Sequence, residues 1–118
     1  MISVMLEKKA WQPKQQVKGT VTWHLDKPPR DLVVRLFWYT QGRGTEDLEV
    51  IDQVGVEAAQ QGQMSFSLQL PEGPYTFSGK LISVIWAVEC VARPSNECGR
   101  EEFVMSPTEK ELMLGGAA

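Results

Sequence analysis

The side chains that most often carry catalysis or bind metal ions are few in this sequence and lie far apart. They are one histidine, His24, and two cysteines, Cys90 and Cys98. A hydrolytic triad needs a base, usually histidine, and His24 lies on the polar side of an alternating segment, which is typical of an exposed surface residue. A zinc site needs three or four ligands, and these three residues could supply them only if distant segments converged. We therefore predict that the protein is not an enzyme and holds no metal.

The sequence also lacks the usual motifs for binding phosphate. The stretch QGRG at residues 41–44 has neither the spacing nor the following lysine of a P-loop. The acidic residues stand singly or as the neighbours Glu46–Asp47 and Glu101–Glu102, and nothing singles out a catalytic pair. We therefore expect no cofactor.

Length and charge restrict the class of protein further. A chain of 118 residues fits one domain, and its net charge of −3 gives no general attraction to nucleic acid or to an anionic membrane. No segment approaches the roughly 20 apolar residues of a membrane span, and the N-terminus places its charges after its apolar residues, the reverse of a secretory signal. We expect a cytoplasmic protein with two separate reduced thiols, although a bridge across a hairpin is an open alternative.

Alternation with a period of two dominates the chain and predicts seven β-strands. The alternating segments cover residues 2–6, 17–25, 32–39, 48–56, 64–70, 81–92 and 103–105. Turns rich in proline, glycine and polar residues separate them, with no helical pattern in between, which favours an all-β, antiparallel, immunoglobulin-like β-sandwich. Residues 32–39 and 81–92 are apolar on both faces, so we place these two strands centrally.

The last residues follow a different pattern. We divide the chain into a β-sandwich domain, residues 1–106, and a short tail, residues 107–118. Ser106, just before the tail, is a candidate helix cap and Pro107 suits the first helical position, so we expect a short helix over residues 107–114.

Two groups of surface side chains are candidates for binding a partner. A basic group surrounds the first turn, where it would either receive an acidic peptide or only protect an edge strand from pairing. An aromatic group does not fit the inward faces, so it either forms an exposed patch or covers the ends of the sandwich. The basic group is Lys8, Lys9, Lys14 and Lys18, and the aromatic group is Trp11, Phe37, Tyr39, Tyr75 and Phe77. From these we select the four lysines, Trp11, Tyr75 and Phe77 as partner-binding candidates.

The turn LPEGPYTFSG at residues 70–79 carries two prolines and two glycines and at first suggests a ligand loop. Alternating strands on both sides favour a structural joint instead, in which Pro71 and Pro74 restrict the backbone. We expect Tyr75 and Phe77 to cover one end of the sandwich.

Three ordered segments of the chain resemble the arrestin-like family, and the resemblance extends over about residues 1–106. In FSLQLPEGPYTFSGKLISVIWAVECVARP, the matching features are Leu70–Pro71, Pro74, Gly79 and Arg93–Pro94. WQPKQQVKGTVTWHL is similar to an earlier family segment, with Lys14 where glycine is usual, and LVVRLFWYTQG is similar to the strand that follows. The resemblance implies an arrestin-like β-sandwich that binds other proteins and does not catalyse reactions. Members usually have two such domains, and this chain has the length of one.

Two hypotheses for function follow. The first is a non-catalytic adaptor or scaffold domain that binds a protein or peptide, or a second copy of itself, along a sheet edge or face. The alternative is a β-sandwich that binds a small molecule or carbohydrate on exposed aromatic rings, namely Trp11, Trp38, Tyr39 and Tyr75.

Overall fold

The computed structural model describes residues 1–42, 47–79, 82–108 and 112–113, and every regular element among them is a β-strand. The strands are β1 (Ile2–Leu6), β2 (Ala10–Trp11), β3 (Gln16–His24), β4 (Asp31–Gly42), β5 (Leu48–Val56), β6 (Gln61–Gln69), β7 (Phe77–Ser78), β8 (Ile82–Arg93), β9 (Cys98–Met105) and β10 (Leu112–Met113). The seven strands expected from alternation are all present. The all-β prediction is therefore confirmed.

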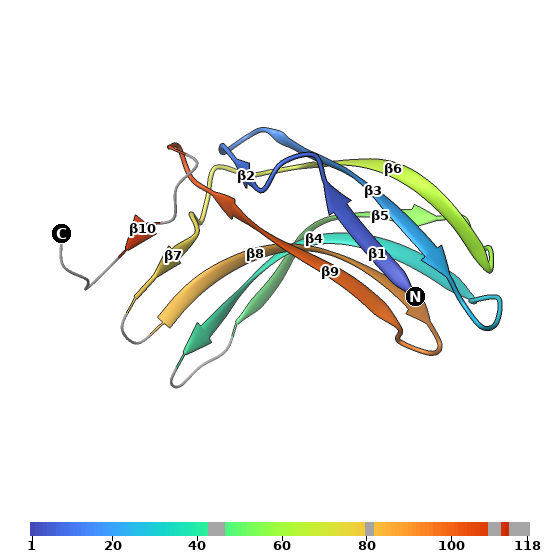
Figure 1. Cartoon of the computed structure of the whole chain (residues 1–118). Coiled ribbons are helices and arrows are strands. Elements are labelled where there is room, and N and C mark those ends of the chain that lie inside the picture. The colour runs from blue at the N-terminus through green and yellow to red at the C-terminus, as the bar shows by residue number, and fades with distance from the viewer. Residues whose placement is uncertain (43–46, 80–81, 109–111, 114–118) are drawn as a thin grey trace.

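The strands form two sheets that pack face to face (Figure 1). The smaller sheet has the order β1-β3-β6, and all of its pairs are antiparallel. The larger sheet has β8 and β4 at its centre, with β5 beside β4, β9 and β7 beside β8, and the two-residue strands β2 and β10 paired with β9 and β7. The central position predicted for the two strands with two apolar faces is therefore correct.

The core lies between the sheets and consists of the inward-facing residues of the alternating strands. In β3, Val17, Val21 and Trp23 are buried between neighbours that are exposed or half-buried, as a strand with one solvent-facing side requires. Trp86, Leu36 and Leu68 are among the largest fully buried side chains. Burial of these apolar surfaces is the main source of stability for a fold of this kind.

The larger sheet is longer than the smaller one. Strands β4 and β8 have 12 residues each, whereas β3 and β6 have 9. Figure 1 shows the C-terminal end of β4, the N-terminal end of β8 and the start of β5 extending beyond the three strands of the smaller sheet. We call this projecting part of the larger sheet the wing.

The proline-rich turn before β7 closes the sandwich near the wing. The indole Nε1 of Trp86 donates a hydrogen bond to the carbonyl of Pro74 at 2.7 Å, and the N–H of Thr76 donates to the carbonyl of Met105 at 2.9 Å. The N–H of Met105 in turn donates to Oγ1 of Thr76 at 3.0 Å. Tyr75 packs partly buried against the core. These contacts support the interpretation of this turn as a structural joint.

The predicted helix over residues 107–114 is wrong in the part of the tail that the structure describes. Pro107 and Thr108 lie in a turn, and Leu112–Met113 form β10, which pairs in parallel with β7. The remainder of the predicted helix lies outside the described residues. The capping residues gave a local signal, but pairing with an available strand decided the conformation of these two residues. No helix in the described part of the chain is long and apolar enough to cross a membrane.

Candidate interaction surface

The residues that could do acid–base or metal chemistry are not brought together. His24 is exposed at the end of β3. Cys90 and Cys98 are free thiols, because Cys90 aligns with Gly99 and Cys98 with Val91, which places the two sulfurs on opposite faces of the sheet. Among the described residues, no group of three or more His, Cys, Asp and Glu could hold a metal ion.

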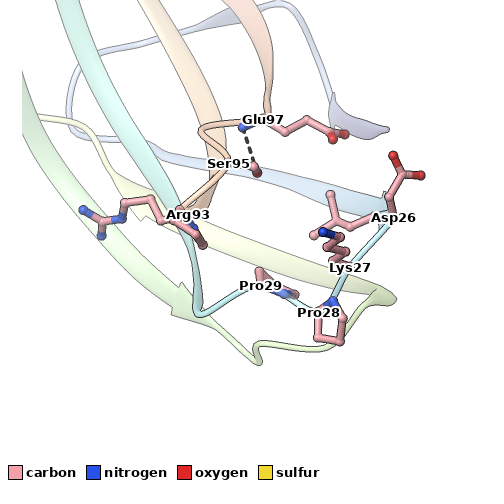
Figure 2. Close-up of a pocket in the computed structure, with 9 residues that line it drawn as sticks. Asp26, Lys27, Pro28, Pro29, Arg93, Ser95 and Glu97 are labelled. Carbon is pink, nitrogen blue, oxygen red and sulfur yellow. Dashed lines mark hydrogen bonds between the residues drawn. The ribbon is translucent and has the colours of Figure 1, made fainter.

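A cavity of about 410 Å³ lies at the end of the sandwich away from the wing (Figure 2). Figure 2 shows Pro28 and Pro29 on one side of it and Ser95 and Glu97 on the other. The hydroxyl of Ser95, on the wall of the cavity, accepts a hydrogen bond from the N–H of Glu97 at 3.3 Å. The residues that line the cavity include no histidine or cysteine. Arg93, also at the rim, pairs with Asp31 at 2.9 Å. The cavity therefore offers apolar walls and a charged rim, but no nucleophile beside a base.

The four lysines selected from the sequence do not form one patch of free charges. Lys8 lies over the ring of Trp11 at 4.7 Å, Lys9 pairs with Glu101 at 3.9 Å, and Lys14 pairs with Glu72 at 2.8 Å. Lys18 lies on β3 beside a shallow cavity of about 330 Å³. Partner binding by these lysines stays a prediction.

Lys14 also adopts an unusual backbone conformation. Its φ angle is +69°, in the left-handed region that glycine adopts most easily. This explains in physical terms why the similar family segment has glycine at this position.

Trp11 belongs to the folded core, and the other aromatic candidates are buried or half-buried. Trp11 is 5% exposed, and its Nε1 donates a hydrogen bond to the carbonyl of Lys8 at 3.0 Å. Tyr75 and Phe77 are half-buried, as is Trp38, which packs against the core. The stacking platforms that a carbohydrate-binding hypothesis needs are therefore reduced to half-buried rings.

The outer face of the larger sheet carries an ionic cluster that our sequence analysis missed. Glu89 on β8 is only 4% exposed, although it lies on the outer face. Arg35 on β4 donates to its Oε1, and Arg100 on β9 donates to its Oε2 from Nη2 at 2.9 Å and from Nε at 3.3 Å. The register aligns Glu89 with both arginines, one on each neighbouring strand. A single acid inside an apolar run was the available signal, but its partners depend on strand order.

The surroundings of Glu89 change its acidity. Burial by itself would raise the pKa of this carboxyl, but the hydrogen bonds and positive charges of Arg35 and Arg100 outweigh burial and lower the pKa below its ordinary value. The carboxylate therefore stays ionised at neutral pH and fixes both guanidinium groups over the sheet.

A second contact extends this cluster toward β5. Arg100 lies over the rings of Phe37 and Tyr39, with its Cζ 5.1 Å and 5.5 Å from their centres, and the hydroxyl of Tyr39 donates to Glu102 at 2.9 Å. A cavity of about 260 Å³ lies beside these rings, with Leu48 of β5 on its wall. On the outer face near the wing, the aromatic rings of Phe37 and Tyr39 thus lie against the sheet, and the charged side chain of Arg100 covers them.

Strand β5 is an uncovered edge of the larger sheet. Among the described strands it pairs with β4 alone. Leu48 is 62% exposed and Val50 is 38% exposed, so an apolar part of this edge faces solvent. The N–H of Gln69, the last residue of β6, donates to Oδ2 of Asp52 at 3.2 Å, which places the preceding residues 48–51 beyond the end of β6. This stretch belongs to the wing.

Two other strands at the margins of the sheets, β9 and β6, differ from β5. β9 is covered on its outer side, because β2 pairs with its end and the carbonyl oxygen of Ile2 lies only 2.3 Å from where a Cβ on Gly99 would be. β6 also pairs with one strand, but its sequence QGQMSFSLQ has no charge, and its exposed side chains are glutamines and serines. Only β5 combines, among these three strands, an open edge, exposed large apolar side chains and charge.

Comparison with known proteins supports the fold and leaves the function open. No protein-family model and no curated protein matches the chain. Among solved structures, the chain is similar to Spo0M, a sporulation control protein from Bacillus subtilis, with a TM-score of 0.63 and 19% sequence identity. The fold is arrestin-like. The match covers 89% of this chain and 48% of that chain, so this chain spans about half the length of the Spo0M chain. At this identity the likeness shows the fold alone.

Proposed function

We propose that this chain is a non-catalytic protein-interaction domain, of the adaptor or scaffold type, which binds an extended segment of another protein along the β5 edge. The observation that carries the proposal is that Leu48 and Val50 are exposed on a strand that lacks a neighbour on one side among the described strands. Backbone N–H and C=O groups on such an edge are a template for a further strand. Natural edge strands are often protected by proline, lysine or a β-bulge. β5 contains neither proline nor lysine, and its bulge, at Ile51, follows the exposed residues Leu48 and Val50.

The free and exposed thiol of Cys98 supports the cytoplasm as the place where this protein works, because exposed thiols persist in a reducing compartment. A partner in the same compartment would meet the β5 edge without competition from a covering strand of the described chain.

The test compares the native chain with a variant in which Leu48→Lys and Val50→Lys protect the edge. Met5→Lys is the matched control, because Met5 is also an exposed apolar residue of a strand, at 69% exposure, but lies in the smaller sheet. Each protein is immobilised, exposed to lysate of the source cells, and the retained proteins are identified by mass spectrometry. Circular dichroism checks that all three proteins are folded.

The proposal expects at least one protein that the native chain and the Met5→Lys variant both retain and the β5 variant loses. Retained proteins that are unaffected by the β5 changes would contradict strand addition at this edge. Sedimentation of the purified chain shows whether a second copy occupies the edge, in which case a dimer forms with the native chain and is lost with the β5 variant.

A further inference from the structure

The uncovered part of β5 presents different chemistry on its two faces. Leu48 aligns with Tyr39 and Val50 with Phe37, so both apolar side chains lie on the outer face, whereas Glu49 aligns with Trp38 and lies on the other face. A strand that adds to this edge therefore meets apolar side chains on one face and a carboxylate on the other. Cross-strand neighbours of this kind set the preference of an added strand.

The charge of this segment has one sign. From residue 46 to residue 52 the sequence EDLEVID contains four acidic residues and no basic one. Asp47 and Glu49 are exposed, and neither forms an ion pair with a described residue. Asp52 accepts hydrogen bonds from the backbone N–H groups of Gln53 at 2.9 Å and Gln69 at 3.2 Å. Arg35 aligns with Gln53, and Arg100 lines the same cavity as Asp47 and Leu48, but both arginines form ion pairs with Glu89.

From this placement we infer that the β5 edge selects an extended partner segment in which apolar residues alternate with lysine or arginine. This inference rests on the proposed function and names the chemistry of the partner. Apolar side chains of the segment lie beside Leu48 and Val50, and its cationic side chains lie beside Glu49 and Asp47. A second copy of this chain fits less well, because its own β5 edge brings acid toward acid, and like charges across a strand pair are destabilising.

Binding of such a segment has a measurable dependence on salt. The carboxylates are at the surface, so their attraction for lysine is screened as the ionic strength rises. The apolar contacts and the backbone hydrogen bonds respond much less to salt. The affinity for a partner that uses both the ionic and the apolar contacts therefore falls at high salt but is not lost.

The test uses three short fluorescent peptides that differ only at alternate positions, with valine alternating with lysine, glutamine or glutamate. Their binding to the native chain is measured by fluorescence anisotropy at about 0.05 M and about 0.5 M salt, which are below and above physiological ionic strength. Backbone amide shifts of residues 48–51 in nuclear magnetic resonance spectra identify where each peptide binds.

We expect the lysine peptide to bind roughly tenfold more tightly than the glutamine peptide at low salt, to shift the amides of residues 48–51, and to lose most of this advantage at high salt. Glu49→Lys should weaken its binding about fivefold to tenfold. Glu57→Lys is the matched control with the same change of charge. Glu57 follows the last residue of β5 and lies eight residues from Glu49, which is roughly 26 Å along an extended chain. This separation exceeds the distance over which salt screens charges, so Glu57→Lys should change peptide binding less than about twofold.

Different outcomes would overturn the inference and the proposed function separately. If the glutamine peptide binds β5 as tightly as the lysine peptide and Glu49→Lys has no effect, the chemistry of the partner is wrong and strand addition stands. If the peptides shift amides elsewhere, or none binds and the Leu48→Lys, Val50→Lys variant behaves like the native chain with lysate proteins, the β5 edge is not a binding site. A dimer that depends on β5 would assign the edge to a second copy and overturn the inference.

Discussion

Arg100 covers Phe37 from two strands away. The guanidinium carbon of Arg100 on β9 lies 5.1 Å from the ring centre of Phe37 on β4, across the small side chain of Ala87 on β8. Phe37 is consequently only 2% exposed, although it faces away from the core between the sheets. The outer face therefore has a small apolar cluster of its own, and a charged side chain covers it.

Replacing this cover is the first prediction. Arg100→Ala should lower the free energy of unfolding by about 1–3 kcal/mol, because it exposes Phe37 and removes one partner of the buried Glu89. Urea denaturation measures this difference. Arg93→Ala is the control, since Arg93 forms an exposed ion pair with Asp31 and should lose less than about 1 kcal/mol. Equal losses in both variants would show that the Arg100–Phe37 contact contributes nothing of its own.

Much of the fold can be predicted from the sequence because apolar and polar residues alternate along most of the long strands. Seven strands and the central position of two of them were predicted from that pattern. The two-residue strands β2, β7 and β10 could not be predicted, because two residues do not show a period. Trp11 was treated as a candidate for binding, but a lone aromatic residue between two turns does not reveal which face it occupies.

The candidate surface was less predictable than the fold. Glu89 meets Arg100 through the register of the next strand, and it meets Arg35, 54 residues earlier in the sequence, only because β4 lies beside β8. Whether β5 lies at an edge depends on strand order, which a period of two does not determine. Local patterns thus predict which side of a strand is apolar, and they do not predict which strand lacks a neighbour.

Glu89 provides a prediction for the dependence of stability on pH. The arginines lower the pKa of this carboxyl in the folded state, so as the pH falls the unfolded chain takes up the proton before the folded chain does. The stabilising contribution is therefore complete above the ordinary pKa of about 4.5 and is lost as the pH falls below it toward the folded-state pKa. Glu89→Gln should lower the free energy of unfolding by about 1–3 kcal/mol at pH 7, and this difference from the native chain should shrink toward pH 3.

The measurement is urea unfolding of both proteins at several pH values. Glu72→Gln is the control, because Glu72 pairs with Lys14 at the surface and both side chains are largely exposed. A difference between Glu89→Gln and native that stays constant from pH 7 to pH 3 would contradict the ionic role of Glu89.

Replacement by alanine should have opposite effects on stability at Gly19 and Gly55. A Cβ on Gly19 would lie 2.3 Å from the carbonyl oxygen of Met5 and 2.9 Å from the ring of Phe66, so β1 and β3 could not keep their spacing. A Cβ on Gly55 would meet nothing within 4 Å. Gly19→Ala should destabilise by about 2–4 kcal/mol, whereas Gly55→Ala should be neutral or stabilise by up to about 1 kcal/mol because it restricts the unfolded chain. Thermal unfolding of the two variants checks the contrast, and similar melting temperatures would contradict the close packing at Gly19.

The two cysteines should react at very different rates with a thiol reagent. Cys98 is exposed, whereas Cys90 is fully buried, and burial, with smaller contributions from Glu89 and Cys98, raises the pKa of the Cys90 thiol to about 11. The thiolate is the form that reacts with dithiobis(nitrobenzoate), which releases one thionitrobenzoate for each thiol. The native protein should therefore release one equivalent quickly, from Cys98, and the second, from Cys90, only on unfolding. Cys98→Ser should abolish the fast phase, and Cys90→Ala should leave it unchanged. Rapid reaction of both thiols in the folded protein would show that β8 opens on the time scale of the assay.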